Sequence, residues 1–473
     1  MLKNHLAGLL LEKLGYSPTP GQQILIEAIA AFAIENQQDR VLIIKGYAGT
    51  GKTTIVSTLV NVLESLGKKS VLLAPTGRAA KVLTAYSGKN AYTIHKRIYR
   101  QKSSAETFGV FVLEKNLYTN TLFLVDEASM ISNQPGDNIV FGSGRLLDDL
   151  IHFIQNEQHC SLIIIGDTAQ LPPVGTSISP ALDKSVLQRY YEAAEEIELT
   201  DVVRQSKHSG ILVNATRIRN NIIGNKMEIP VFFVRDFPDI HPITGNELTE
   251  FLTRSYDRDG IENTIIICRS NKRANKFNDG IRKQILGRED EITAGDLLMV
   301  VKNNYYWLSG SDKIDFIANG DIIKVLKIRK IQEIYGCRFA DVMIEFIDYD
   351  LKIETKIMLD TLTVDGASMR QEDNQKLFNA IMEDYQDLQP RKSQYEKVKT
   401  NAFYNALQVK FAYAVTCHKA QGGQWKNVYI DIGYYRTENV DMDFLRWLYT
   451  AFTRATDTLY LVNFPESLIE TGK

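Results

Sequence analysis

The segment from Gly46 to Thr53 has the pattern of a phosphate-binding loop, G-x-x-x-x-G-K-T. It lies between the apolar run Val41–Ile44 and a helical pattern that begins at Thr54, which is the strand, loop and helix order that this motif requires. The glycines let backbone N–H groups surround phosphates, Lys52 neutralises phosphate charge, and the Thr53 hydroxyl can ligate Mg²⁺. A chance match is the alternative interpretation. The sequence predicts a nucleoside triphosphate site formed by Gly46, Gly49, Thr50, Gly51, Lys52, Thr53 and Thr54.

Two further strand-like runs end in side chains that suit phosphate chemistry. Leu122–Val125 is followed by Asp126, which can hold Mg²⁺ through its water shell, and by Glu127, which can orient or deprotonate the attacking water. Ile163–Ile165 is followed by a segment that contains Gln170, a candidate sensor of the γ-phosphate. Because the carboxyl ends of parallel strands meet at one edge of a sheet, we expect these side chains to lie together. A simple acidic turn is the alternative for the carboxylate pair.

The composition describes a globular protein of several units. At 473 residues the chain is too long for one hydrophobic core, and 44% hydrophobic with 24% charged residues is typical of soluble domains. No apolar stretch approaches the roughly 20 residues of a membrane span, and the N-terminus lacks signal-peptide architecture, so we expect a cytoplasmic protein without a membrane partner.

The net charge of −2 gives no overall sign of a nucleic-acid partner, although a motor can confine its basic groups to one groove. The four cysteines lie far apart in the sequence, which predicts buried thiols and indicates neither a zinc site nor a disulfide framework. They are Cys160, Cys268, Cys337 and Cys417.

Short β-rich runs alternate with helical patterns in two sets along the chain, which is typical of parallel α/β domains. Only the first set carries a phosphate loop. Two such cores suggest a nucleotide held between two domains. The first set is Val41–Ile44, Ser70–Ala74, Leu122–Val125 and Leu162–Ile165, and the second is Thr264–Cys268, Phe411–Val415, Val428–Ile432 and Leu459–Val462.

A segment inside the second set, from Glu291 to Thr400, has a different pattern. Turn signals separate β-rich runs in its first half, which predicts a small β-barrel. Its second half, from Asp365 onward, is charged and has helical spacing at Leu377 and Ile381, which predicts a solvated helical excursion.

The order of these segments over nearly the full length resembles superfamily 1 helicases, in particular the RecD and Dda group. A shared order of all these motifs along the chain identifies a protein family more specifically than any single motif does. The segments that carry the resemblance are Thr19–Gln22 (the adenine-reading Q motif), Gly46–Thr53 (motif I), Ala74–Ala80 with Thr93–His95 (motifs that grip single-stranded DNA), Asp126–Glu127 (motif II), Gly166–Val174 (motif III), Leu199–Gln205 (motif IV), Val415–Gly422 (motif V) and Tyr449–Ala455 (motif VI).

The resemblance implies an α/β fold with two RecA-like parallel-sheet domains, an inserted SH3-like β-barrel and a small hairpin insertion. The implied units are residues 1–205 for the first RecA-like domain, with the hairpin insertion at 96–115, residues 206–290 plus 405–473 for the second, and residues 291–404 for the barrel with its helical excursion.

The resemblance also assigns roles in ATP hydrolysis. Arg204 and Arg454 are implied arginine fingers, which stabilise charge on the γ-phosphate from across the cleft. A surface ion pair is the alternative at either position. The catalytic set is then Glu127, Lys52, Arg204, Arg454 and Gln170; the ATP contacts also include Gln22 and the phosphate loop; and Mg²⁺ is held by Thr53 and Asp126.

Contacts to DNA are expected from groups that reach phosphates without reading sequence. A structural role at a strand end is the alternative for both histidines among them. The implied DNA-binding residues are Pro75, Thr76, Gly77, Arg78, Thr93, His95, Thr416, His418 and Lys419.

The predicted function is that of an ATP-dependent DNA helicase that moves 5′ to 3′ on single-stranded DNA, and the direction comes only from the resemblance. Its partners would be single-stranded DNA, tailed or forked duplex DNA, and replication or repair proteins, and we expect a monomer. The alternatives are an RNA or RNA–DNA helicase, and a nucleic-acid clamp or loading factor in which ATP only switches affinity. A small-molecule kinase is disfavoured because it leaves the second α/β core unexplained.

Relatives carry a strand-splitting pin in the hairpin insertion. The polar centre of this segment is followed by Phe108 and Phe111, so a short hairpin with an aromatic tip is predicted. Stacking of an exposed ring on the terminal base pair would favour the melted fork. The alternative is an ordinary loop whose aromatic side chains pack inward.

Overall fold

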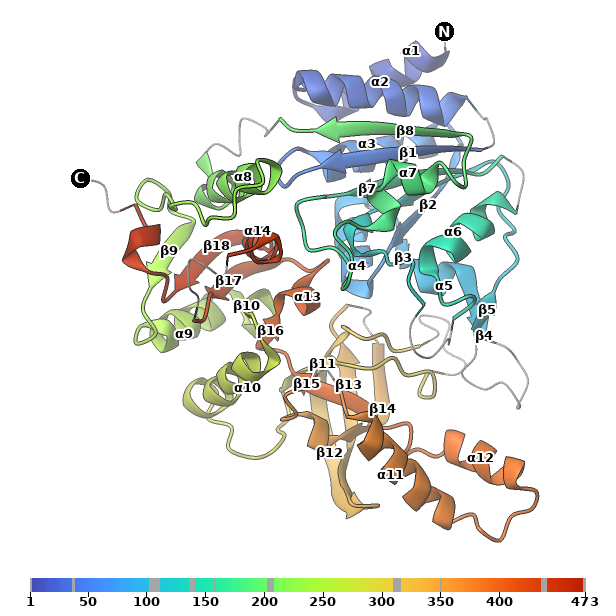
Figure 1. Ribbon diagram of the computed structural model, residues 1–473, viewed down its shortest axis with the longest axis vertical. Coiled ribbons are helices and arrows are strands. Elements are labelled where there is room, and N and C mark those ends of the chain that lie inside the picture. Colours follow the sequence, from blue (N-terminus) through green and yellow to red (C-terminus); the bar gives the residue numbers. More distant parts are fainter. Residues whose placement is uncertain are drawn as a thin grey trace.

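The computed structural model describes residues 2–35, 39–101, 111–135, 141–156, 159–201, 208–308, 316–348, 351–366, 368–434 and 440–470. These residues form two parallel sheets, a closed barrel and a small hairpin (Figure 1). Within these ranges, no helix is both long enough and apolar enough to span a membrane. The four cysteines are buried, as predicted.

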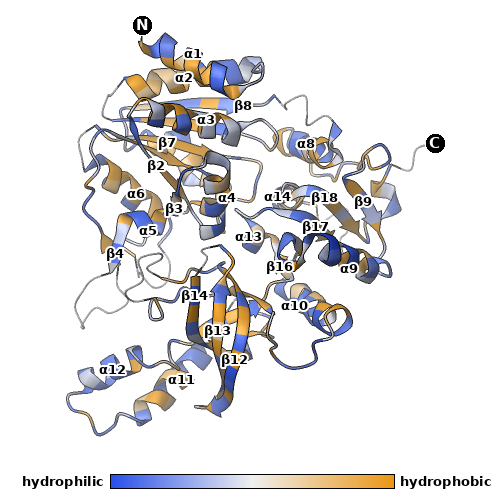
Figure 2. Cartoon of the chain, turned by 180° about the vertical axis from the view of Figure 1, so that it is seen from behind, coloured by the Kyte–Doolittle hydropathy of each residue, from blue (hydrophilic) through white to orange (hydrophobic). Residues whose placement is uncertain are grey.

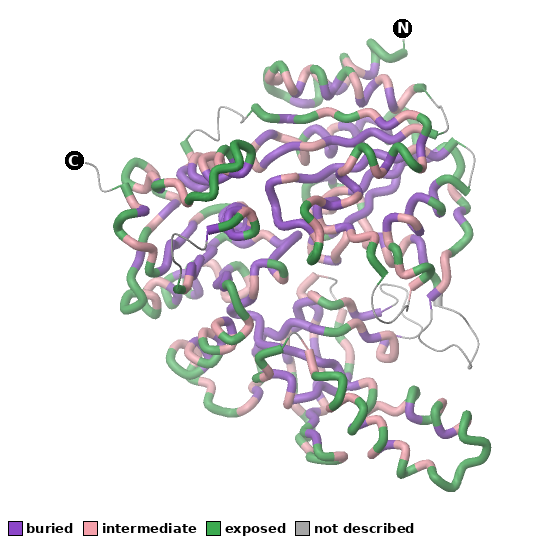
Figure 3. Tube along the Cα trace, viewed as in Figure 1, coloured by how far each residue is buried: buried purple, intermediate pink, exposed green. Residues whose placement is uncertain are grey.

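The first sheet has six parallel strands in the order β3-β2-β6-β7-β1-β8. Its inner strands are continuous apolar runs because both faces are covered, as Figures 2 and 3 show for β2 and β7. The strands are β1 (Arg40–Gly46), β2 (Lys69–Ala74), β3 (Ala91–Thr93), β6 (Thr121–Val125), β7 (Ser161–Gly166) and β8 (Ala193–Leu199).

Helices cover both faces of this sheet. Leu42 and Ile44 of β1 pack with α1, α2 and α3, whereas Val41 and Ile43, which alternate with them, pack with α5 and α6 on the other face. The helices of this part are α1 (Leu2–Leu14), α2 (Pro20–Ile34), α3 (Lys52–Ser65), α4 (Gly77–Ser87), α5 (Ile94–Ile98), α6 (Leu146–Gln155) and α7 (Lys184–Leu187).

The strand order brings the predicted chemistry together. Strands β6, β7 and β1 are neighbours, and their carboxyl ends lead into Asp126, Asp167 and the phosphate loop. Parallel pairing therefore places three segments that are far apart in sequence at one edge of the sheet.

The second sheet has five parallel strands in the order β16-β10-β17-β18-β9. Its core also takes in Tyr47 of the phosphate loop and Leu171, which both belong to the first domain by chain position. The elements are β9 (Ile240–Ile243), β10 (Thr264–Cys268), β16 (Ala414–Thr416), β17 (Trp425–Asp431), β18 (Ala455–Val462), α8 (Gly210–Ile223), α9 (Leu248–Asp259), α10 (Asn271–Gly280), α13 (Cys417–Ala420) and α14 (Met442–Phe452).

A closed five-stranded barrel is inserted between β10 and β16. Two helices, α11 (Gln371–Glu383) and α12 (Arg391–Lys399), follow its fourth strand and project away from both sheets, as Figure 1 shows. Leu377 and Ile381 of α11 pack on the barrel, and most of the other side chains of this helix are exposed or half-buried. The barrel strands are β11 (Leu297–Val300), β12 (Ile322–Ile334), β13 (Cys337–Phe346), β14 (Leu351–Met358) and β15 (Leu407–Phe411).

One predicted strand is wrong. Phe411–Val415 was expected as a single strand of the second core, but β15 ends at Phe411 and closes the barrel by pairing with β11 and β14, whereas β16 begins at Ala414 in the second sheet. An apolar run has no feature that marks where it changes sheets. We therefore propose that the barrel unit extends to Phe411, and not only to residue 404.

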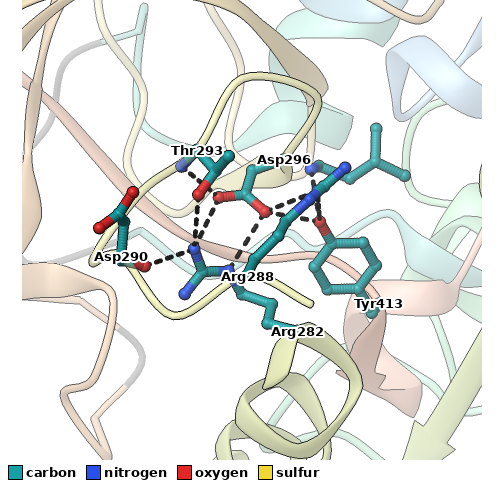
Figure 4. Close-up of polar contacts among 7 residues, drawn as sticks. Arg282, Arg288, Asp290, Thr293, Asp296 and Tyr413 are labelled. Carbon is teal, nitrogen blue, oxygen red and sulfur yellow. Dashed lines mark hydrogen bonds and ion pairs between the residues drawn. The ribbon is translucent and has the colours of Figure 1, made fainter. Parts of the chain in front are cut away.

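A buried polar network holds the barrel to the second domain (Figure 4). Asp296, just before β11, accepts hydrogen bonds from Arg282 Nη2 at 3.0 Å, Arg288 Nη1 at 2.8 Å and the Tyr413 hydroxyl at 2.8 Å. Arg282 belongs to the second domain, and Tyr413 lies between β15 and β16. The points where the chain enters and leaves the barrel are thus tied to one carboxylate.

The hairpin insertion contains β4 (Tyr99–Gln101) paired antiparallel with β5 (Phe111–Leu113). Residues 102–110, with the pin candidate Phe108, lie outside the described residues. The predicted fold class is confirmed: two parallel-sheet α/β domains, an inserted closed barrel and a small hairpin.

Candidate functional site

The phosphate loop is built by backbone conformations that favour glycine. Gly49 and Gly51 have φ values of 76° and 84°, in the left-handed region, and Gly51 caps the start of α3. Lys52 Nζ donates to the carbonyl oxygens of Gly46 at 2.5 Å and Tyr47 at 2.8 Å. A side chain at Gly46 would collide with Lys52, because an added Cβ would lie 2.8 Å from its Cδ. The lysine therefore lies folded against its own loop.

Gln22 supports this loop from α2. Its Nε2 donates to the Thr50 carbonyl at 2.9 Å, and its Oε1 accepts from the N–H of Thr19 in a capping box. Gln22 is fully buried and does not line the cavity described next. In this structure it positions the loop, and its contact with adenine stays a prediction.

A cavity of 320 Å³ opens between the two sheets. The first domain contributes the phosphate loop and acidic residues, and the second contributes residues around Arg454. Two expected contacts, Gly46 and Thr50, do not line it. The predicted residues that do are Gly49, Gly51, Lys52, Thr53, Thr54, Asp126, Glu127, Gln170 and Arg454.

Asp126 and Glu127 form the acidic wall of the cavity. Asp126 Oδ1 accepts from the N–H of Glu127 at 2.8 Å. Burial, followed by the neighbouring Glu127 carboxylate, raises the pKa of Asp126. Glu127 has φ = 53°, a conformation that costs energy for a residue with a side chain and that is common at functional sites. Among the described residues, no group of three or more His, Cys, Asp or Glu side chains could hold a metal ion by itself.

The loop after β7 faces the same cavity. Gln170 is buried, and its Oε1 has no hydrogen-bond partner among the described residues. A buried acceptor without a partner is costly, and it suits a site that receives a ligand with donors or a coordinated water.

Arg454 reaches the cavity from the second domain. Its guanidinium is buried and donates to the carbonyls of Thr450 at 3.1 Å and Gly423 at 3.3 Å, and to the Thr453 hydroxyl at 3.2 Å. These partners are neutral, so the guanidinium charge remains available to an anion. Arg204, the second expected finger, lies outside the described residues.

Side chains of the second domain also hold the first domain directly. The N–H of Leu171 donates to Thr450 Oγ1 at 2.9 Å, and its carbonyl accepts from Gln421 Nε2 at 2.7 Å. Gly422 lies so close to Thr76 that an added Cβ would come within 2.8 Å of its Oγ1. The segments predicted as motifs III, V and VI therefore meet across the cleft.

A second cavity, of 260 Å³, lies where the two domains and the barrel meet. Five of the expected DNA-binding residues line it: Thr76, Gly77, Arg78, His418 and Lys419. The barrel contributes Asn319, whose Oδ1 accepts from Lys419 Nζ. No signal in the sequence indicates that a turn of the barrel lies beside motif V.

Two cations in this second cavity are partly desolvated. Burial lowers the pKa of Arg78, whose guanidinium lies 4.0 Å from the centre of the Trp425 ring. Burial, together with the positive charge of Lys410, lowers the pKa of Lys419 to about 8. The charge of Asp348 opposes the shift of Arg78, and the carboxylate of Asp321 belongs to a residue that lines the same cavity.

The other expected DNA contacts lie outside this cavity. Thr93 caps α5, because its Oγ1 accepts from the N–H of Lys96 at 3.1 Å. His95 packs edge-on against Phe141 at 4.7 Å, and burial lowers its pKa to about 4. The structural alternative therefore describes His95 in this conformation, and its contact with DNA stays a prediction. Pro75 and Thr416 are half-buried and do not line the cavity.

Phe111 does not provide an exposed pin. The side chain is 2% exposed and packs against Phe141 at 4.9 Å and Tyr305 of the barrel segment at 4.8 Å. The inward-packing alternative is correct for this residue, because its ring completes an aromatic cluster between hairpin and barrel. Sequence spacing alone could not reveal that contact.

Comparisons with known proteins agree with this geometry. Residues 19–229 match the family model of an AAA domain, and residues 411–462 match that of a UvrD-like helicase C-terminal domain. The chain is similar to the ATP-dependent DNA helicase dda of Enterobacteria phage T4, with 25% identity over 82% of this chain and 87% of the relative. It is also similar to the ATP-dependent RecD2 DNA helicase of Deinococcus radiodurans, with 24% identity over 94% of this chain, which spans half of that longer relative.

Among solved structures, the chain is similar to the Pif1 helicase from Bacteroides in complex with ADP-AlF3 and ssDNA, with 15% identity, a TM-score of 0.45, and coverage of 97% of this chain and 95% of that chain. The predicted resemblance to superfamily 1 helicases of the RecD and Dda group is confirmed by the family models and the two sequence relatives. The predicted enzyme class, a helicase with nucleoside-triphosphatase activity, is confirmed as well.

Proposed function

We propose that this superfamily 1 helicase uses ATP and Mg²⁺ to move 5′ to 3′ on single-stranded DNA and to unwind duplex DNA. The observation that carries the proposal is the juxtaposition of two cavities. One contains Lys52 and Arg454 from opposite domains, and the other contains Thr76 and Lys419 from the same two domains. The DNA substrate and the direction are supported by similarity to the Dda and RecD2 helicases, whose names describe DNA helicases.

The side chains of the first cavity have distinct roles in this proposal. Lys52 leaves its loop carbonyls to bind the β- and γ-phosphates, and Glu127 orients the attacking water and accepts its proton. Gln170 uses its unpartnered Oε1 to position that water. Arg454, with Arg204 as a second finger, stabilises charge that develops on the γ-phosphate.

A magnesium ion fits the acidic wall. Asp126 and Glu127 are adjacent carboxylates, and the pKa of Asp126 is raised in part by its neighbour, so a bound cation would relieve their repulsion. The Thr53 hydroxyl and Asp126 would hold the ion. Bound there, Mg²⁺ would neutralise negative charge on the phosphate oxygens.

Movement along DNA would follow from the contacts across the cleft. Leu171 is held by Gln421 and Thr450 of the second domain, so a change at the γ-phosphate site alters how the two domains meet. The second cavity is lined by residues of both domains. It would therefore open or close with the cleft. A strand gripped alternately by the two domains would then advance with each ATP hydrolysed.

We propose a monomer acting on tailed or forked DNA, with replication or repair proteins as partners.

Strand displacement on tailed duplexes tests the proposal. Purified protein is mixed with Mg²⁺, ATP and a duplex that carries a 5′ tail, a 3′ tail or no tail, each made with a DNA or an RNA loading strand. Unwinding of the 5′-tailed DNA substrate alone is the expected result, and Glu127→Gln serves as the inactive control. A preference for the RNA tail would support an RNA helicase, and DNA-stimulated ATPase without displacement would support a clamp or loading factor.

A further inference from the structure

A buried arginine outside the predicted motifs contacts the phosphate loop from the second domain. Arg219 lies on α8 and is 8% exposed. Its guanidinium carbon lies 4.6 Å from the centre of the ring of Tyr47, the second residue of the phosphate loop. Because α8 packs on α14 and β18, this contact crosses from the second domain to the first.

The guanidinium of Arg219 is poorly satisfied apart from this ring. Its Nε and Nη1 atoms are buried without a hydrogen-bond partner among the described residues, and Nη2 makes only a 3.5 Å contact with Asn220 Oδ1. A buried charge with so few partners costs stability, and an apolar side chain of similar volume would pack there at lower cost. Its presence is better explained by a function than by the stability of the fold.

The ring beneath Arg219 is rigidly connected to the loop. Tyr47 is 5% exposed, and its hydroxyl donates to Glu198 Oε1 at 2.6 Å. Its carbonyl accepts from Lys52 Nζ at 2.8 Å and from Thr50 Oγ1 at 2.8 Å. A displacement of the ring would therefore move the carbonyl that holds the catalytic lysine.

A second contact from the same domain reaches the next loop residue. The N–H of Ala48 donates to the Tyr449 hydroxyl at 2.9 Å. Arg219 and Tyr449 thus hold two consecutive residues of the phosphate loop, one through its ring and one through its backbone. Neither contact can form unless the two domains are together.

We propose that Arg219 is a positioning residue for ATP hydrolysis, which holds Tyr47 so that the phosphate loop adopts its hydrolysis-competent shape only when the cleft is closed. The inference rests on the proposed function only in that ATP is hydrolysed in this cleft. A desolvated guanidinium over an aromatic ring contributes about 2 kcal/mol, which corresponds to about 30-fold in a rate.

Substitutions at Arg219 test this role, and the chain provides a matched control. Arg219→Met removes the charge and keeps an apolar stem, and Arg219→Lys keeps the charge. Arg217 lies on the same helix with its guanidinium 4.0 Å from the centre of the Phe233 ring, but that contact stays within the second domain. Arg217→Met therefore removes a similar cation–ring contact that does not cross the cleft.

We expect Arg219→Met to lower kcat for ATP about 10- to 30-fold, Arg219→Lys to lower it less, and Arg217→Met to leave it within about twofold. Tyr47→Leu should resemble Arg219→Met, and the double variant Tyr47→Leu/Arg219→Met should be no slower than the slower single variant. Thermal unfolding of each variant separates this effect from loss of folding. A role confined to packing would lower the unfolding temperature and leave kcat per folded molecule unchanged.

The proposal is overturned if Arg219→Met keeps wild-type kcat, if Arg217→Met loses as much, or if the effects of Tyr47→Leu and Arg219→Met simply multiply. If Arg219→Met does not fold, Tyr47→Leu decides, because full activity without the ring contradicts the proposal. These assays use ATP hydrolysis alone. A wild-type protein that hydrolyses ATP without unwinding DNA would therefore contradict the proposed function and still allow this inference to be tested.

Discussion

The Tyr449 hydroxyl donates a hydrogen bond to Asp167 Oδ2 at 2.7 Å, although the two residues belong to different domains. Both are buried, and the same hydroxyl accepts the N–H of Ala48 from the phosphate loop. Burial is the main reason that the pKa of Asp167 is raised, and the bond from Tyr449 opposes that shift. One oxygen atom of the second domain thus joins two strand ends of the first.

Tyr449→Phe is expected to slow ATP turnover about 10- to 100-fold, because hydrogen bonds that involve a buried carboxylate contribute about 1.5–3 kcal/mol. The ring still fills its place, so the fold should persist. Steady-state ATPase rates and thermal unfolding provide the measurement. Tyr429→Phe is the control, since Tyr429 is equally buried in the second domain and its hydroxyl pairs with Ser255 of that same domain. Equal losses in both variants would contradict a role for the bond across the cleft.

Lys52→Ala and Glu127→Gln should fail in different ways. The first removes the ammonium that neutralises phosphate charge, so ATP binding and hydrolysis are both expected to be lost while the fold remains. The second keeps the shape of the side chain and removes the base, so ATP should bind without turnover. Binding of a fluorescent ATP analogue and release of phosphate measure the two steps. Loss of ATP binding in Glu127→Gln would instead assign Glu127 a structural role.

Binding of single-stranded DNA is expected to weaken as the pH rises through about 8. Burial lowers the pKa of Lys419 to about 8, so its ammonium group loses a proton more readily than that of an ordinary lysine. A DNA phosphate bound beside it would favour the charged form. The protonated fraction falls from about one half at pH 8 to about one tenth at pH 9, which predicts about a fivefold loss of affinity over that unit. Fluorescence anisotropy at constant ionic strength measures it. Lys419→Arg, which stays charged, should lose this pH dependence.

Asp296→Asn is expected to destabilise the protein by about 3–5 kcal/mol, because it leaves the buried Arg282 and the half-buried Arg288 without their carboxylate. Tyr413→Phe removes one bond to the same carboxylate and should cost about 1.5–3 kcal/mol. Urea unfolding measures both. The control is Asp360→Asn, which breaks a more exposed pair with Arg338 in the barrel and should change stability by at most about 1 kcal/mol. Similar effects at Asp296 and Asp360 would mean that the buried network does not hold the barrel in place.

The phosphate loop, the acidic pair and the positions of most strands along the chain could be predicted from the sequence. Each depends on residues that are adjacent along the chain: glycines at positive φ, a lysine at the start of a helix, and carboxylates at the end of an apolar run. The helices that cover the sheets follow from periodicity in the same way. Local geometry is set by residue type, so these features need no knowledge of distant contacts.

The tertiary structure decided what distant residues do to one another. It turned Gln22 toward Thr50, buried Phe111 against Tyr305, and placed Arg219 over Tyr47. None of these pairs has a signal in spacing or composition, because each depends on how separately formed elements pack. The sequence alone therefore determined which chemistry the chain carries, whereas packing across the cleft decided which side chains hold that chemistry in place.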